Sequence, residues 1–302
     1  MPSDLPSFLA GVRDLVDARL PRLLGGGGEA APGADDPLPR AVREGLLSPG
    51  KRVRPALVFL SGEVFGARRE RLLDPACAVE MVHAASLVLD DLPSMDDATL
   101  RRGRPALHVG HGEDVAILAA VTLLARAFGL LAEAGLDGAG KGSLPASATL
   151  DLVSRLADAC GLEGLASGQA LDLRTGEGDA TFDRLETIHA RKTGALFVAA
   201  AEFGAVIGGA RERELAAVRS YARNVGLAFQ IVDDLLEKGP AAVTGKAAQR
   251  PSAPTFVLHV GADGARRLVG ELTGHAVEAI AGFGPRGALL ADFAALLRDR
   301  SS

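Results

Sequence analysis

The chain has 302 residues, 48% of them hydrophobic and 24% charged, which is enough apolar material for a sizeable core and excludes disorder of the whole chain. Thirty-eight acidic residues against 33 basic ones give a formal net charge of −5. The charges alternate in short clusters and form no basic stripe, which argues against nucleic acid as the main partner.

Targeting and membrane signals are not evident in the sequence. The opening segment, MPSDLPSFLAGVRDLVDARLPR, has no basic stretch followed by an apolar run and a cleavage site. We also find no apolar stretch of the roughly 20 residues needed to span a bilayer, so a soluble cytoplasmic protein is expected. Because Cys77 and Cys160 are the only cysteines, we expect neither a disulfide framework nor a cysteine metal site, and any metal should be bound by oxygen.

Apolar residues recur at three- and four-residue spacing in most windows, which predicts an all-α fold. The Gly/Pro-rich residues 24–37 are predicted to be a flexible linker, and residues 135–145 a second loose connection. Neither separates two independent cores, and no internal repeat is found, so a single domain over residues 1–302 is predicted. The predicted helices cover, in chain order, residues 5–23, 37–47, 51–65, 73–92, 112–134, 147–173, 181–207, 211–237, 252–259, 262–282 and 286–299.

A strongly apolar helical segment ends in a run of carboxylates, LVLDDLPSMDD. Pro93 should end the helix and let Asp96 and Asp97 fold back toward Asp90 and Asp91. Four carboxylates this close repel one another unless cations neutralise them, and oxygen ligands at this density suit Mg²⁺. The alternative is a solvated acidic helix end, which would oppose the helix macrodipole.

Basic residues follow this acidic run directly, at Arg101, Arg102 and Arg104. Carboxylates beside guanidinium groups form a site suited to a metal-bridged polyphosphate. His83 lies two turns before Asp90 on the same side of the helix, although a satisfied core histidine is the usual interpretation of a lone one.

A second helical segment, FQIVDDLLE, carries a similar stripe. Gln230, Asp233, Asp234 and Glu237 fall at i, i+3, i+4 and i+7 on an otherwise apolar helix. Taken alone, the stripe could simply face water. Two Asp-Asp stripes on two apolar helices favour a shared metal cluster, because buried carboxylates need a partner.

Lysine is scarce, with five residues among the 33 basic ones, so the positions that keep it are informative. Lys51 lies in SPGKRVRP, Lys192 lies beside Thr193 in HARKTGALF, and Lys246 lies in TGK after the second stripe. Three of the five lysines therefore lie in motifs with other polar residues.

Gln169 and Asp172 lie one turn apart in GLASGQALDL. The glycines in this region would let neighbouring helices approach closely. Helix capping or a plain surface position is the alternative, and it would be preferred without the other motifs.

Together these motifs resemble the trans-isoprenyl diphosphate synthases of the polyprenyl synthetase family. GKRVRP resembles the family's first basic motif, and DDLPSMDD followed by LRRGRP resembles its first aspartate-rich motif in the variant with two extra residues. GQALDL, KTGALF and FQIVDD then occur in the expected order, so the match runs from about Ser48 to nearly the C-terminus. The resemblance implies an all-α bundle around a deep central cavity, the isoprenoid synthase type I fold, usually homodimeric, with the two aspartate-rich helices facing one another across the mouth.

The implied activity is a Mg²⁺-dependent transfer in which an allylic diphosphate condenses with isopentenyl diphosphate. The implied metal set, holding three Mg²⁺ ions against the allylic diphosphate, is Asp90, Asp91, Asp96, Asp233, Asp234 and Glu237. The cations that would neutralise that diphosphate are Arg101, Lys192 and Lys246. The residues that would surround the ionising carbon are Gln169, Asp172, Thr193 and Gln230. The residues that would bind isopentenyl diphosphate are Lys51, Arg54, His83 and Arg102. The catalytic set among all these is Asp90, Asp91, Asp96, Arg101, Lys192 and Asp233.

Two departures from the family pattern stand out. Glu237 replaces the usual third Asp of the second motif but keeps the charge on the same helical face. After Lys246 the chain has Ala247 where the family usually has Asp, and the Lys usual about eight residues on is missing, with Arg250 as the candidate substitute. A weakly active subunit that modulates a partner synthase is therefore an alternative. A terpene cyclase is a third interpretation, but GKRVRP and LRRGRP, which form a second diphosphate site, count against it.

Product length should depend on the residues one turn before Asp90. Ala85 and Ser86 are both small, where family members that make a 15-carbon product commonly place an aromatic ring. We therefore expect a 20-carbon product, geranylgeranyl diphosphate, with farnesyl diphosphate as the alternative.

Overall fold

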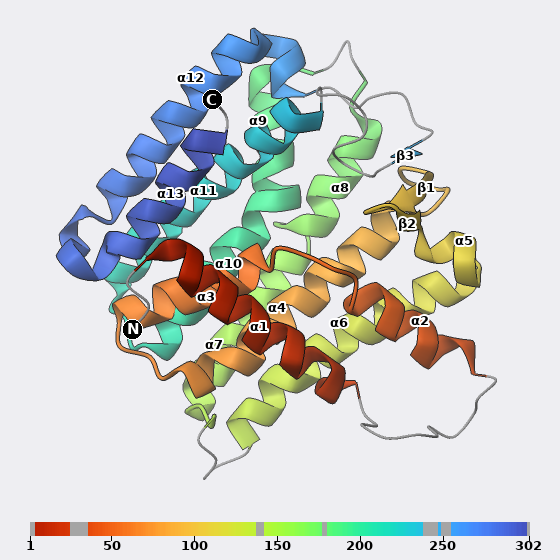
Figure 1. The fold of residues 1–302 in the computed structure, drawn as a ribbon, viewed down its shortest axis with the longest axis horizontal. Coiled ribbons are helices and arrows are strands. Elements are labelled where there is room, and N and C mark those ends of the chain that lie inside the picture. The colour runs from red at the N-terminus through yellow and green to blue at the C-terminus, as the bar shows by residue number, and fades with distance from the viewer. Residues whose placement is uncertain are drawn as a thin grey trace.

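The computed structural model describes residues 4–24, 36–136, 142–176, 180–237, 247–248 and 255–300, and it confirms the all-α prediction (Figure 1). The α-helices are α1 (Leu5–Leu23), α2 (Pro37–Leu46), α3 (Val53–Val64), α4 (Arg69–Asp90), α5 (Leu107–His111), α6 (Glu113–Leu136), α7 (Ala146–Cys160), α8 (Leu165–Arg174), α9 (Phe182–His189), α10 (Ala195–Ile207), α11 (Glu212–Glu237), α12 (Phe256–Ala279) and α13 (Ala288–Arg300). A π-helical turn η2 (Ala190–Gly194) and a 3-10 helix η3 (Ala281–Gly287) complete the helical elements. Most of the predicted linker at 24–37 lies outside the described residues.

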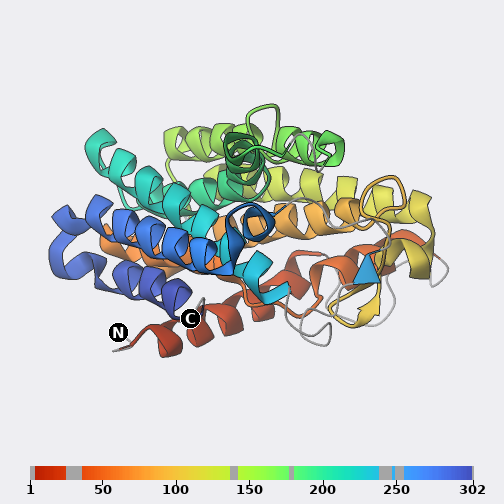
Figure 2. The same cartoon turned by 90° about the horizontal axis from the view of Figure 1, so that it is seen from above.

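Helix α1 shows how the apolar pattern produces these elements. Asp4 caps the helix by accepting a hydrogen bond from the backbone N–H of Ser7 at 2.8 Å. Phe8, Val12 and Val16 follow at four-residue spacing and are completely buried. The helix therefore lies on one side of the bundle, with α7 on the opposite side and α3 and α4 between them (Figure 2).

Small residues let the central helices pack closely. A Cβ atom on Gly204 of α10 would lie 2.1 Å from the carbonyl oxygen of Val58 on α3 and 2.5 Å from the backbone nitrogen of Gly62. Only glycine fits such a contact. Helices α3, α4 and α10 thus form the middle of the bundle, and α4 carries the first carboxylate run into it.

The structure divides the chain into helices differently from the prediction in three places. The helix predicted over 147–173 is two helices, α7 and α8, interrupted between Gly161 and Gly164. The helix predicted over 181–207 contains the π-helical turn η2 between α9 and α10. The helices predicted over 252–259 and 262–282 join in α12 as a kinked pair, because Gly261 has a φ of 74°.

Three short strands were not predicted. Strand β1 (Ala98–Arg101) pairs antiparallel with β2 (Arg104–Pro105) and, on its other edge, with β3 (Ala247–Ala248). Period-two alternation cannot be seen in segments this short. The sheet matters for the site, because it joins the end of the first carboxylate loop to the segment that follows Lys246.

Two helices are long and apolar enough to cross a membrane by length and composition, which corrects the expectation that no apolar stretch is long enough. They are α4 and α6, and 67% of the apolar window of α4 is buried inside the bundle, against 39% for α6. Helix α12 and the segment after it pass the same test together but bend by 89°. Helix α6 therefore keeps a large apolar surface that the described part of the chain does not cover.

Candidate active site

The first carboxylate loop folds back onto its own helix, as predicted from Pro93. The backbone N–H of Asp96 donates to the carbonyl oxygen of Asp90 at 2.9 Å, and that of Ala98 donates to the carbonyl of Asp91 at 3.1 Å. Asp97 takes a left-handed conformation, with a φ of 48°, at the tightest point. The loop therefore holds Asp96 close to the end of α4.

Asp91 faces Arg101 on strand β1. Nε of Arg101 lies 3.0 Å from each oxygen of the Asp91 carboxylate, and Nη2 also donates to Oδ1. Burial would lower the pKa of Arg101, but Asp91, Asp90 and Asp96 together raise it. The structure thus places Asp91 in an ion pair with Arg101, although the sequence assigned it to the metal set.

Lys192 lies opposite the first carboxylate loop, on the π-helical turn. Its Nζ donates to Oδ2 of Asp172 on α8 at 2.7 Å. Burial alone would lower the pKa of Lys192, but Asp90, Asp172 and Asp96 raise it above its usual value, so the amine stays charged. Gly168 makes this approach possible, because a Cβ there would lie 2.2 Å from the backbone nitrogen of Lys192.

The second stripe joins the same turn through a chain of hydrogen bonds. The hydroxyl of Thr193 donates to Oε1 of Gln230 at 2.9 Å, and Nε2 of Gln230 donates to Oδ1 of Asp234 at 2.9 Å. Asp234 is buried, which corrects the alternative that the whole stripe faces water. The side chain of Glu237, like all of Lys246, lies outside the described residues.

The basic motif forms an adjoining cationic pocket around His83, which Arg101 also lines. Nη1 of Arg54 lies 3.2 Å from Nε2 of His83, and because a guanidinium only donates, this imidazole nitrogen is the acceptor. Burial and then the neighbouring arginines lower the pKa of His83 well below its usual value, so the ring is neutral. Burial also lowers the pKa of Arg54 to about 10, while Glu80 and Asp233 oppose that change.

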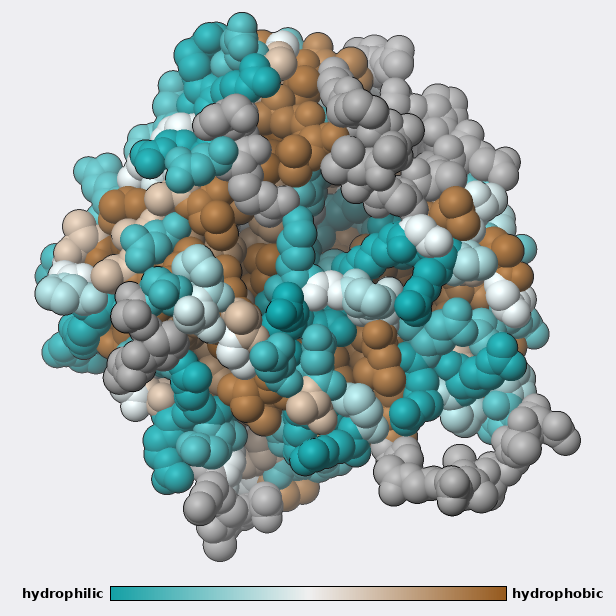
Figure 3. Space-filling view, in the orientation of Figure 1, coloured by the Kyte–Doolittle hydropathy of each residue, from teal (hydrophilic) through white to brown (hydrophobic). Residues whose placement is uncertain are grey.

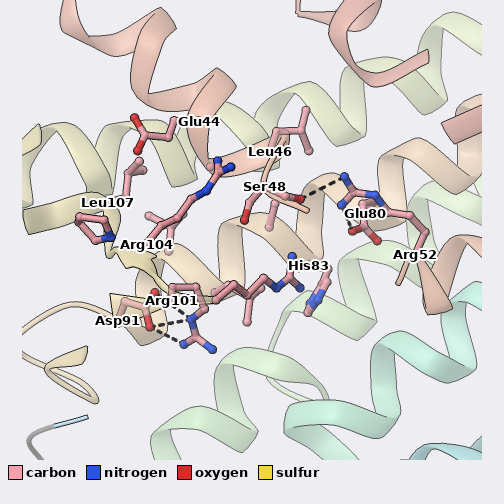
Figure 4. Close-up of a pocket in the computed structure, with 16 residues that line it drawn as sticks. Glu44, Leu46, Ser48, Arg52, Glu80, His83, Asp91, Arg101, Arg104 and Leu107 are labelled. Carbon is pink, nitrogen blue, oxygen red and sulfur yellow. Dashed lines mark hydrogen bonds and ion pairs between the residues drawn. The ribbon is translucent and has the colours of Figure 1, made fainter. Parts of the chain in front are cut away.

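Figure 4 shows the side chains of this pocket. Arg101 and His83 line it from one side, and Arg52 beside Glu80 closes one end. Arg102 also lines the pocket. Arg102 donates through Nη1 to the carbonyl of Pro49, just before Lys51. In the space-filling view, hydrophilic side chains gather around a hollow near the middle of the visible face (Figure 3).

Phe197 contacts this site but was not identified as a candidate residue from the sequence. The guanidinium of Arg54 lies over the ring of Phe197 on α10, 5.0 Å from its centroid, and Phe197 in turn contacts Phe229 at a centroid distance of 5.1 Å. Aromatic residues are only 4% of the chain, so the Phe at the end of KTGALF could have been identified from the sequence as a candidate site residue. Phe197 is completely buried, so the guanidinium of Arg54 packs directly on the helical core.

The carboxylates of the site fit a metal ion whose coordination shell is completed by the substrate. Within the part of the chain that the structure describes, no three His, Cys, Asp or Glu side chains are close enough to hold a metal ion by themselves. Mg²⁺ is commonly bound by one or two carboxylates, with phosphate oxygens and waters filling its octahedron. The amide oxygen of Gln169 is buried and has no hydrogen-bond partner among the described residues, which suits a ligand in this space.

The segment after Lys246 reaches the first carboxylate loop. Ala248 pairs with Ala98 and Ala247 with Leu100, in the antiparallel register of β3 on β1. The backbone thus joins the second motif's loop to the strand that carries Arg101. Arg250, the candidate substitute for the missing Lys, lies outside the described residues.

The two predicted chain-length positions differ in exposure. Ala85 is completely buried, whereas Ser86 is half-buried and donates to the carbonyl of His83 at 2.8 Å. Ser86 lies one turn before Asp90 on the same side of α4. It is therefore the better position from which to change the space below the carboxylates.

Comparison with known proteins points to one family. Residues 36–255 match the family model for polyprenyl synthetase. A geranylgeranyl diphosphate synthase of Pantoea ananas is 43% identical over 224 residues, which cover 74% of this chain and 70% of that protein. Geranylgeranyl pyrophosphate synthase 11, chloroplastic, of Arabidopsis thaliana is 41% identical over 250 residues, covering 80% and 69%. Among solved structures, an FPP/GFPP synthase from Zymomonas mobilis matches with a TM-score of 0.83 at 30% identity, over 97% of this chain and 98% of that one.

Proposed function

The chain belongs to the polyprenyl synthetase family, and from this premise we propose that it condenses an allylic diphosphate with isopentenyl diphosphate to make geranylgeranyl diphosphate. One observation carries the proposal: two charged sites lie side by side but differ in composition. Asp90 and Asp96 face Lys192 and Arg101 in the first, and arginines surround a neutral His83 in the second. A metal-bridged diphosphate fits the first, and a diphosphate bound by cations alone fits the second.

The residues of the first site stabilise the departing diphosphate. We assign metal binding to Asp90, Asp96 and Asp233, with three ions as the proposed number. When bound there, Mg²⁺, which this family uses, would neutralise the charge that develops on the leaving group. Lys192, fixed by Asp172, and Arg101, fixed by Asp91, add preorganised positive charge at the same place.

The residues of the second site present the nucleophile. When the allylic C–O bond breaks, the double bond of isopentenyl diphosphate attacks the carbocation, and a proton then leaves to the released diphosphate. The Thr193 hydroxyl donates its hydrogen bond to Gln230, so the lone pairs of the hydroxyl oxygen can point toward the carbocation and stabilise it. The rings of Phe197 and Phe229 help to exclude water, which would quench the carbocation.

Product length is the first property to test. Purified protein is incubated with Mg²⁺, isopentenyl diphosphate and each of the three short allylic primers, and the products are sized. We expect 20 carbons from the wild type and a shorter product from Ser86→Phe, because the ring fills the space below Asp90. Ser86→Ala is the matched control and should keep the wild-type length. A wild type that stops at 15 carbons would overturn the product assignment and leave the reaction class intact.

We also propose that the enzyme is a homodimer joined through α6. Ile117, Leu118 and Val121 lie within four residues of one another on this helix and are exposed, with exposed fractions of 42%, 52% and 54%. Exposed apolar patches of this kind commonly mark protein–protein contacts. A cytoplasmic location stays a prediction.

A modulatory subunit is the second candidate, and the residue pattern after Lys246 favours it. Ala247 stands where the family usually has Asp, so a charge near the first carboxylate loop is missing. The Lys usual about eight residues further on is missing too, and losing one preorganised cationic donor at a developing anion typically costs on the order of 100- to 1000-fold in turnover. Slow turnover by the chain alone is therefore expected, and complete inactivity without a partner would support this second candidate.

A further inference from the structure

Arg52 has a backbone conformation that arginine rarely adopts. Its φ is 50° and its ψ 41°, in the left-handed region, at the residue immediately before α3. Such a conformation costs a non-glycine residue about 1–3 kcal/mol and persists only when the surroundings hold it. The side chain of Arg52 supplies that hold.

All three nitrogens of the buried Arg52 guanidinium are bound by protein acceptors. Nε donates to Oδ1 of Asp17 on α1 at 2.7 Å, and Nη1 donates to Oε1 of Glu80 on α4 at 2.7 Å. Nη2 donates to the carbonyl of Ser48 at 3.2 Å, as Figure 4 shows. Arg52 thus fixes the loop at 48–50 to two helices at once, and its nitrogens are already committed within the protein.

A second arginine holds the same loop from the side of the substrate pocket. Arg102 is also left-handed, with a φ of 53°, and donates to the carbonyl of Pro49. Gly50 lies between the two guanidinium groups, since a Cβ there would be 3.0 Å from Nη1 of Arg102 and 3.2 Å from Nη1 of Arg52. Arg52, the loop and Arg102 therefore form one contiguous unit, with Lys51 inside it.

We propose that Arg52 is a positioning residue for isopentenyl diphosphate: it lies at one end of the pocket, but its nitrogens bind protein acceptors, and it acts by fixing the 48–50 loop and thereby setting Lys51 and Arg102. This role rests on the proposed function and on the assignment of Lys51 and Arg102 to the second diphosphate, which the family resemblance implies. The fork of the guanidinium is required, because a lysine ammonium cannot span three acceptors in one plane. The allylic site has Arg101 on β1 and its other residues on the carboxylate loop, α8, η2 and α11, so we expect it to keep its geometry when the 48–50 loop moves.

The test compares Arg52→Lys and Arg52→Gln with Arg19→Gln. Arg19 joins the same two helices, α1 and α4, through two hydrogen bonds to Asp74 of 2.8 and 2.9 Å, but it is not part of the loop. KM for isopentenyl diphosphate, KM for the allylic diphosphate, kcat and the melting temperature are measured for each variant. The control thus reports what a lost α1–α4 ion pair does by itself.

Both Arg52 variants should raise KM for isopentenyl diphosphate and leave KM for the allylic substrate unchanged. A loop displaced by about 1 Å can cost on the order of 100-fold in kcat/KM. Arg19→Gln should lower the melting temperature and change neither KM. If Arg52→Gln does not fold, Glu80→Gln and Asp17→Asn apply the same test, since each removes a single acceptor.

An unchanged KM for isopentenyl diphosphate in active variants would overturn the role of Arg52 while the proposed function stands. A rise in both KM values together would overturn it too, because it would indicate a general structural defect. A wild type that incorporates no isopentenyl diphosphate would overturn the proposed function itself, and the role of Arg52 with it.

Discussion

Asp90 and Asp91 are adjacent in the sequence but have different surroundings in the folded chain. Asp90 raises the pKa of Lys192 across the site, whereas both oxygens of Asp91 bind Arg101. We infer that Asp91 positions Arg101, whereas Asp90 is the carboxylate that we propose for the metal.

Magnesium titrations of Asp90→Asn and Asp91→Asn separate these roles. Asp90→Asn should raise the Mg²⁺ concentration needed for half-maximal turnover. Asp91→Asn should leave that concentration unchanged and lower kcat by on the order of 100-fold, because Arg101 loses its partner as a preorganised donor. Equal shifts in the magnesium requirement for both variants would show that Asp91 is also a metal ligand.

His189 makes stability depend on pH. It is 8% exposed, neither ring nitrogen has a hydrogen-bond partner among the described residues, and the ring contacts Phe256 at a centroid distance of 5.2 Å. Burial, with Lys192 adding to it and Asp172 opposing it, lowers the pKa of His189 from 6.5 to about 4. The folded state therefore resists protonation while the unfolded chain accepts it.

Stability should fall as the pH drops from about 6.5 to about 4. At about 1.4 kcal/mol for each pKa unit, the contribution of His189 is on the order of 3 kcal/mol. His189→Phe should reduce this loss, measured as the free energy of unfolding in denaturant across that pH range. His275→Gln, at an exposed histidine, is the control and should keep the wild-type profile. A His189→Phe profile as steep as the wild type would contradict the assignment.

At the scale of elements, the contact between α8 and the π-helical turn η2 sets Lys192 against Asp172. Gly168→Ala puts a methyl group where the backbone nitrogen of Lys192 is only 2.2 Å away, so the two elements must separate. We expect kcat to fall by on the order of 100-fold, the effect of about 1 Å of misplacement. Gly270→Ala on α12 meets no atom within 4 Å and should leave kcat unchanged. Equal kcat values for the two variants would contradict this account of the contact.

The elements also show what sequence could and could not predict. Pro93 predicted the fold-back of Asp96 onto Asp90 because proline must end the helix. The π-helical turn was not predicted because the residues HARKTG fit an ordinary α-helix. A single extra residue in one turn does not visibly change the spacing of the apolar residues. Left-handed Arg52 and Arg102 were equally invisible, because a positive φ is expected at glycine and tertiary contacts impose it here. The pairing of Asp91 with Arg101 could not be predicted either, because it depends on where strand β1 lies in the folded chain.

At the scale of the whole molecule, the uncovered apolar face of α6 should hold two copies together. Val121→Glu places a charge on that face and should give a monomer by size-exclusion chromatography with light scattering. Val277→Glu changes an exposed residue of α12 and is the control. This variant should stay dimeric. A Val121→Glu protein that is still a dimer would show that the copies meet elsewhere.

The central claim is that this chain, by itself, elongates prenyl diphosphates. The most direct test is the transfer of labelled isopentenyl diphosphate to farnesyl diphosphate by the purified chain, with no other protein present. We predict slow, Mg²⁺-dependent formation of a labelled 20-carbon product that Asp233→Asn abolishes. A chain that incorporates no label, yet changes the product of a partner synthase, would contradict the claim and establish a modulatory subunit instead.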